Sequence, residues 1–185
     1  MEKKVPAGKV IAYVISVLLH AFGIMTLLTI AKIKPLPFLR FYDKLDALGG
    51  WSLILKYAIL IVIMSISIMT FSTVSGTLKN RRKRKFWTIA ITCWSTLITI
   101  PLLLSFVALL LTAIFPDPTG GVKAFLDGFN SIMPVTDIHN AFLAVPAFAR
   151  SLKALQWTYV GGIVLSIIFL AVPITSCVQT VKKAK

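Results

Sequence analysis

The sequence is poor in charge, and above all in acidic side chains. Charged residues make up 14% of its 185 positions, and only six residues are Asp or Glu. A soluble domain carries about 25% charged residues, whereas the mean hydropathy here is +0.88. A soluble protein could not cover its surface with this composition. The sequence therefore predicts an integral membrane protein that forms a single domain over residues 1–185.

Residue types that build catalytic or metal sites are also scarce. The chain has two cysteines, Cys93 and Cys177, and two histidines, His20 and His139. Both cysteines fall in apolar stretches without metal-binding spacing, which favours their interpretation as small apolar residues. The sequence contains no glycine-rich phosphate loop and no hydrolase nucleophile or zinc motif. We therefore expect no enzymatic activity, no metal and no cofactor.

Long apolar stretches are what the sequence does have. A helix that rises 1.5 Å per residue needs about 20 residues to cross a hydrocarbon core of ~30 Å, and in lipid its backbone must satisfy its own hydrogen bonds. The fold class predicted is an all-α integral membrane protein with four transmembrane helices. The third helix is long enough to require a tilt or a bend at Pro101. The four predicted spans cover about residues 10–31, 51–78, 86–115 and 157–178.

Basic residues are distributed unevenly between the two sides of these spans. The two terminal segments and the run "KNRRKRK" at 79–85 hold 12 of the 20 Lys and Arg residues. Loops rich in Lys and Arg face the cytoplasm. The sequence therefore predicts that both termini and the basic loop 79–85 are cytoplasmic, and that outer loops 32–50 and 116–156 lie on the far side.

The second outer loop, 116–156, is predicted to form amphipathic helices. Its segment "VKAFLDGFNSIM" has apolar residues at helical spacing, and Pro146 divides the following segment, "TDIHNAFLAVPAFARSLKALQW". Four phenylalanines in this loop need an apolar partner, which is lipid, the bundle itself or another subunit. The candidate partner contacts are Phe125, Phe129, Phe142 and Phe148.

His20 is the one ionisable residue at depth that invites a chemical interpretation. A haem would need a second axial ligand at similar depth, and His139 falls in the outer loop. We therefore interpret His20 as a neutral side chain that forms hydrogen bonds within a close helix contact. Gly162 and Ser166 form a small-xxx-small pair that predicts similar packing of the fourth span. The residues that share the His20 face are Ala12, Ser16, His20 and Gly23.

Hydroxyl side chains recur at helical spacing on the third span. With the serines and threonines near the cytoplasmic end of the second span, they are predicted to bond across a hairpin, each pair contributing ~0.6 kcal/mol. The alternative is a polar path for an ion or small solute, although the charged rings typical of such paths are missing from the sequence. The polar stripe consists of Thr88, Thr92, Thr96 and Thr99.

The basic run suggests three kinds of contact. Nucleic acid is disfavoured, because the run is short and tethered at both ends to apolar spans. A topology anchor is favoured, but six charges exceed what orientation requires. The surplus predicts contact with anionic lipid head groups or an acidic partner surface. The candidate contacts are Lys79, Arg81, Arg82, Lys83, Arg84 and Lys85.

The last four residues, "KKAK", resemble the dilysine retrieval signal of endoplasmic-reticulum membrane proteins. The resemblance implies the endoplasmic reticulum membrane in a eukaryote, whereas a bacterial protein with such a tail would lie in the plasma membrane. The function predicted is that of a non-enzymatic accessory, assembly or scaffolding subunit of a larger membrane complex. The alternatives are an oligomeric channel or transporter, and an anionic-lipid-interacting membrane protein.

Overall fold

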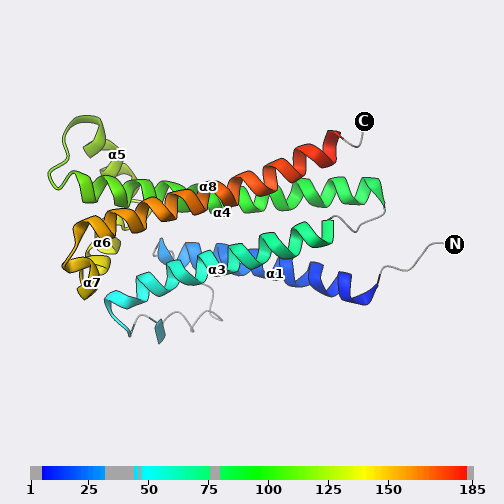
Figure 1. Cartoon of the computed structure of the whole chain (residues 1–185), viewed down its shortest axis with the longest axis horizontal. Coiled ribbons are helices and arrows are strands. Elements are labelled where there is room, and N and C mark those ends of the chain that lie inside the picture. The colour runs from blue at the N-terminus through cyan, green and yellow to red at the C-terminus, as the bar shows by residue number, and fades with distance from the viewer. Residues whose placement is uncertain (1–5, 32–43, 46, 76–79, 183–185) are drawn as a thin grey trace.

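The structure is a computed structural model in which four long helices run side by side (Figure 1). It describes residues 6–31, 44–45, 47–75 and 80–182. Those residues contain no strand. Each long helix has an apolar window that is long enough to cross a membrane, which confirms the prediction of an all-helical chain with four such helices. The long helices are α1 (Ala7–Ile30), α3 (Gly50–Ser75), α4 (Arg81–Ile114) and α8 (Leu152–Lys182).

All four helices begin earlier than the hydropathy predicts, and α4 and α8 do so by five residues. α4 begins at Arg81, so residues 81–85 are helical, and their prediction as loop is wrong. Lys and Arg are good helix formers, and the side-chain oxygen of Asn80 accepts a hydrogen bond from the backbone N–H of Arg82 at 3.1 Å, as an N-cap does. Ser151 caps α8 in the same way, through the N–H of Ala154 at 3.3 Å.

The long helices form two pairs, α1 with α3 and α4 with α8 (Figure 1). α3 and α4 follow one another in the chain, yet they contact each other only sparsely. The expectation that these two helices form a closely packed hairpin is therefore corrected. Each pair instead buries most of its contact surface within itself. α4 and α8 also remain single helices through Pro101 and Pro173.

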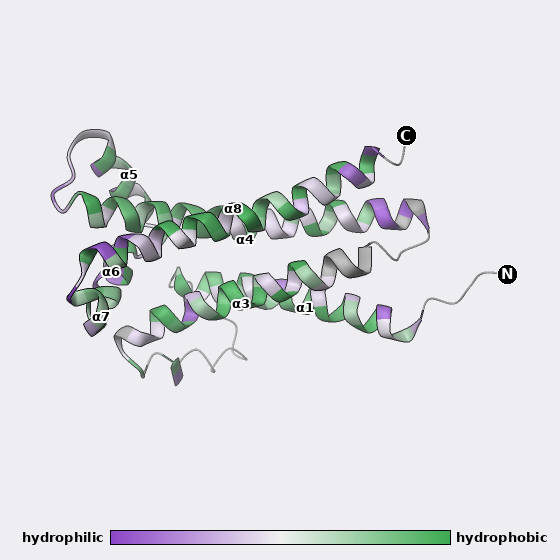
Figure 2. Ribbon diagram, viewed as in Figure 1, coloured by the Kyte–Doolittle hydropathy of each residue, from purple (hydrophilic) through white to green (hydrophobic). Residues whose placement is uncertain are grey.

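Three short helices close one end of the bundle, which we call the loop end (Figure 1). They are α5 (Gly120–Asn130), α6 (Val135–Leu143) and α7 (Pro146–Ala149). The start of α1 and the end of α8 lie at the opposite, terminal end, together with the start of α4 (Figure 1). Hydrophilic residues are concentrated on α4 and α8 at that end (Figure 2).

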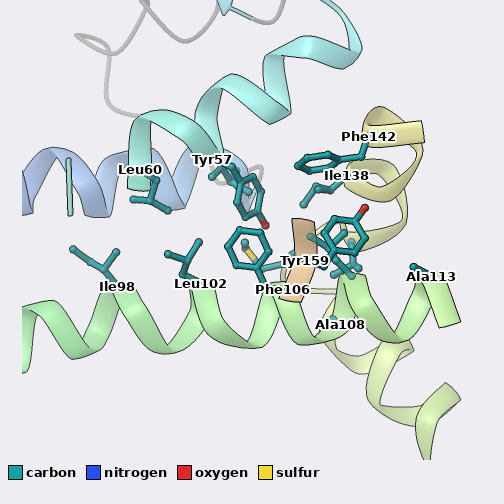
Figure 3. Close-up of a cluster of buried hydrophobic side chains, with 14 of the residues drawn as sticks. Tyr57, Leu60, Ile98, Leu102, Phe106, Ala108, Ala113, Ile138, Phe142 and Tyr159 are labelled. Atoms are coloured by element: carbon teal, nitrogen blue, oxygen red, sulfur yellow. The ribbon is translucent and has the colours of Figure 1, made fainter. Parts of the chain in front are cut away.

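The main apolar core lies at the loop end, where α6 packs against α3 and α4 (Figure 3). The ring of Tyr57 meets Phe106 edge-on at a centroid distance of 5.4 Å, and Phe142 meets Tyr159 at 5.5 Å. The Tyr57 hydroxyl also lies 2.7 Å from Oγ of Ser105. Aromatic rings from α3, α4, α6 and α8 therefore hold the two helix pairs together at this end.

Candidate functional site

A cluster of buried polar side chains joins three helices in the terminal half of the bundle. Ser16 and His20 come from α1, Ser67 from α3 and Ser95 from α4. At most 3% of the surface of any of them is exposed. Polar groups at such depth must bond to one another, because neither water nor lipid offers a partner there.

The hydrogen bonds assign a neutral tautomer to His20. Its Nδ1 lies 2.8 Å from the backbone oxygen of Ser16, and because a carbonyl can only accept, Nδ1 carries the proton. Nε2 lies 3.0 Å from Oγ of Ser95 and accepts from that hydroxyl. Oγ of Ser67 contacts both ring nitrogens. The imidazole thus links α1 to α3 and α4 without needing a charge.

Both ring nitrogens of His20 have hydrogen-bond partners within the bundle. Within residues 6–31, 44–45, 47–75 and 80–182, no group of three His, Cys, Asp or Glu side chains lies close enough to hold a metal ion. The other histidine, His139, lies on α6 at the loop end, where its Nδ1 is 3.1 Å from the hydroxyl of Tyr159. Burial lowers the pKa of His139 below its usual 6.5 and keeps this ring neutral as well.

A cavity of about 120 Å³ lies beside the polar cluster, between α1 and α4. We call it the α1–α4 cavity. Its walls are mainly apolar, and His20 is the ionisable residue that reaches it. Two indole rings one above the other on α4 form its outer rim, and both are partly exposed. The lining residues are Val17, His20, Ala21, Trp87, Ala90, Ile91 and Trp94.

Of the other predicted packing residues, three lie at helix contacts, and the fourth, Ala12, lies at the edge of its helix face. A Cβ on Gly23 would lie 3.4 Å from Cδ1 of Ile98, in ordinary contact across to α4. A Cβ on Gly162 would lie only 2.5 Å from the ring of Phe106, so α8 approaches α4 there more closely than alanine allows. Ser166 is buried and donates to the carbonyl of Gly162 at 2.8 Å. Ala12 is half-buried at the edge of the α1 face.

The hydrogen bonds described for the threonine stripe on α4 run within α4 and to α8. Each hydroxyl donates to the carbonyl four residues earlier in its own helix, at 2.7–2.8 Å. Thr92 also reaches the carbonyl of Pro173 on α8 at 3.2 Å. The predicted bonds to the serines and threonines of α3 from Ser72 onwards stay a prediction for the stripe, whose members are Thr88, Thr92, Thr96 and Thr99. On α3, Ser65 bonds to its own helix, and the hydroxyl side chains from Ser72 onwards lie outside the described residues.

The basic run is divided between two environments. Arg82 and Lys85 are exposed, whereas Arg84 is half-buried and turns its guanidinium against the bundle. Lys79 and the side chains of Arg81 and Lys83 lie outside the described residues. The described residues of the basic run therefore do not all extend into solvent, because the head group of Arg84 is partly enclosed.

The four phenylalanines of the loop end also differ in environment. Phe142 is buried in the core, and Phe148 packs on it at a centroid distance of 5.9 Å. These two rings find their apolar partner in the bundle itself. Phe125 and Phe129 stack on each other along α5 at 5.9 Å, and Phe125 remains exposed. Of these four rings, Phe125 on α5 is the one with an exposed surface available for a partner.

Sequence reasoning found His20 but missed most of its surroundings. It did not select Ser67, Tyr13 or the two tryptophans of the cavity rim. Each of these residues is unremarkable within its own helix, and its position becomes informative only once α1 is placed against α3 and α4.

A scan against protein-family models and searches of curated proteins and solved structures found no match to this chain.

Proposed function

We propose that this chain is a non-enzymatic subunit that helps to assemble or scaffold a larger membrane protein complex through its loop end. The observation that carries the proposal is a group of exposed apolar side chains on α4, on α5 and just after α5, which we call the loop-end patch. Its members are Ile114, Phe115, Phe125 and Ile132, with 48%, 45%, 36% and 64% of their surfaces exposed.

Helix length supports a position for this patch outside the hydrocarbon. α4 has 34 residues and is about 51 Å long, some 20 Å more than the hydrocarbon core. If Lys85 marks one membrane surface, the ~20 residues after it cross the core, and Ile114 lies about 14 Å beyond. Exposed apolar side chains at that height have no acyl chains to contact. A protein surface is the partner that would cover them.

Photo-crosslinking in native membranes tests the proposal. A photoreactive amino acid at Ile132 should give a discrete protein adduct, identified by mass spectrometry, whereas the same group at Val164, an exposed position midway along α8, should give lipid adducts. The double substitution Phe115→Asn with Ile132→Asn should remove that adduct from a third patch position, Phe125. Protein adducts at neither position, or equal adducts at both, would overturn the proposal.

The proposed orientation places the terminal end in the cytoplasm. It is supported by the basic residues at the start of α4 and the end of α8, where the ribbon is hydrophilic (Figure 2). In a background with Cys93 and Cys177 replaced by Ser, a cysteine at exposed Ser131 should react with a membrane-impermeant maleimide on intact cells or sealed right-side-out vesicles. A cysteine at exposed Gln179 should react only after permeabilisation. The reverse pattern would invert the topology.

The polar stripe gives the channel alternative less support than the subunit proposal. Its hydroxyls donate to carbonyls of their own helix, and Thr92 adds a contact to α8. These bonds are the ones that helix packing in a membrane uses.

A further inference from the structure

Two buried polar atoms lie unpaired on residues one helical turn before Val17 and Trp87, which line the α1–α4 cavity, and we call this end of the cavity its mouth. The hydroxyl of Tyr13 and Nε of Arg84 are buried, and neither has a hydrogen-bond partner among the described residues. The ring of Tyr13 meets that of Trp87 edge-on at a centroid distance of 4.9 Å. Arg84 precedes Trp87 by three residues and so shares its face of α4.

Unpaired buried donors are uncommon in folded proteins, because each one loses its bonds to water without replacement. Both groups here are donors: the guanidinium can only donate, and the phenol donates through its O–H. Two unpaired donors on neighbouring faces of α1 and α4, one of them beside Trp87, indicate a place for an acceptor from outside the chain. An anion suits the place best, since one of the two donors carries a permanent positive charge.

The charge distribution favours the same ligand. Lys9 lies one helical turn before Tyr13 on α1, and Lys85 follows Arg84 on α4, so further positive charge surrounds the mouth. The acidic residues that the structure describes, Asp117, Asp127 and Asp137, all fall at or near the loop end. No described carboxylate is therefore placed to neutralise this group of cations.

Below the mouth, the surroundings become apolar. Val17 and Ala21 continue the Tyr13 face of α1, while Ile91 and Trp94 continue the Trp87 face of α4, and together they line the cavity. Its volume of about 120 Å³ resembles that of cavities that take up a benzene-sized group, ~150 Å³. It therefore holds part of one hydrocarbon chain, and the partly exposed indoles leave its side open towards lipid.

We propose that the α1–α4 cavity, with Arg84 and Tyr13 at its mouth, is a binding site for an anionic phospholipid. The phosphate accepts hydrogen bonds from Nε of Arg84 and from the hydroxyl of Tyr13, and one acyl chain enters the cavity towards His20. A free phosphate ion would satisfy the donors but leave the apolar cavity unfilled. An acidic protein segment would have to enter from the lipid side. The site is at the opposite end from the loop-end patch, so this inference does not depend on the proposed subunit role.

The two indoles at the cavity rim supply the measurement. With Trp51 and Trp157 replaced by Phe, the remaining fluorescence comes from Trp87 and Trp94. The full chain in nanodiscs of zwitterionic phospholipid is titrated with phospholipid carrying brominated acyl chains, which quench nearby indoles. Brominated phosphatidylglycerol should quench at a low mole fraction and saturate, whereas brominated phosphatidylcholine should quench only in proportion to its amount.

Substitutions at the mouth separate a built site from general charge attraction. Arg84→Gln should weaken the saturating phase roughly fivefold, the amount expected for one basic residue near an anionic surface, and Tyr13→Phe should weaken it by a smaller factor. Lys182→Gln removes an exposed charge at the end of α8 and should leave it unchanged. Equal losses in Arg84→Gln and Lys182→Gln would overturn the proposal.

Two further comparisons complete the test. Ala90→Leu adds bulk to the cavity lining and should weaken saturation while leaving the mouth intact, and unchanged thermal unfolding shows that the variant is folded. Excess inorganic phosphate should fail to displace the brominated anionic lipid. Displacement by phosphate, together with no effect of Ala90→Leu, would show an anion site that holds no lipid chain. Equal quenching by the two brominated lipids would show that the site has no head-group preference. Either result overturns the proposal.

Discussion

The two ends of the bundle are built by different means. At the loop end, aromatic and aliphatic side chains from α3, α4, α6 and α8 interlock, and α6 fills the space between the helix pairs (Figure 3). In the terminal half, a histidine and three serines link α1, α3 and α4 by hydrogen bonds, with a cavity beside them.

The difference indicates where stability and where binding reside. In the described part of the loop end, the core is densely packed, and its tyrosine hydroxyls pair with Ser105 and His139. The terminal half leaves space, charge and two unpaired donors, which are the features that a ligand can use. Substitutions at the loop end should therefore cause large losses of stability. Substitutions in the terminal half should instead change lipid binding.

The largest effect is expected from Phe142→Ala at the loop end. Phe142 is 5% exposed and touches both Phe148 and Tyr159. Its truncation should reduce the free energy of unfolding by about 3–5 kcal/mol, as for other buried aromatic side chains. Denaturant titration in detergent would measure it. Phe125→Ala, on an exposed ring of α5, serves as the control and should change stability by less than about 0.5 kcal/mol.

A smaller loss is expected where α8 meets α4. Gly162→Ala forces a methyl group against Phe106, which is 3% exposed and has little room to move. Overpacking of this kind costs about 1–3 kcal/mol. A Cβ on the neighbouring Gly161 meets no described atom within 4 Å. Gly161→Ala should therefore be neutral or slightly stabilising, and equal behaviour of the two variants in thermal unfolding would contradict the observed helix contact.

The polar link should contribute less than the apolar core. A double-mutant cycle between His20→Ala and Ser95→Ala should give a coupling free energy of about 0.6 kcal/mol, the average for hydrogen bonds between membrane helices. The pair of His20 with Ser65 is the control, because Ser65 bonds to its own helix and should show no coupling. A coupling as large as the Phe142→Ala effect would remove the distinction between the two ends.

The smallest effect is a pH dependence at the loop end. Burial lowers the pKa of His139 in the folded chain, so between that pKa and the unfolded value of about 6.5 the unfolded state binds more protons. Stability should therefore fall as pH decreases through this range. Thermal unfolding at pH 7.5 and 5.5 should show a smaller acid-induced decrease in Tm for His139→Gln than for the parent chain. An equal decrease in the two would assign the pH dependence to other groups.

The positions of the long helices could be predicted because each depends on its own residues. An apolar stretch of sufficient length must hydrogen-bond internally in lipid, whatever lies beside it. The helix starts were less predictable, because Asn80 and Ser151 cap helices whose first turns are polar. Hydropathy alone ignores those turns.

Helix pairing could not be predicted in the same way. Chain order suggested that α3 packs on α4, but the tight approach at Gly162 and Phe106 and the fit of α6 between the pairs depend on side-chain shape across helices. The same limit applied to the site. His20 stood out as a rare residue at depth, whereas its partner Ser67 is one of many hydroxyls and was identified only from its contacts.

The sparse contact between α3 and α4 has a consequence for assembly of the chain. Residues on either side of the short connection before Asn80 form two helix pairs, each packed mainly within itself. Two separately expressed polypeptides, divided at this connection, should meet in the bilayer and complement one another. His20 lies on the first fragment and Ser95 on the second, so the complete polar cluster would form only when the two halves have found their mutual register.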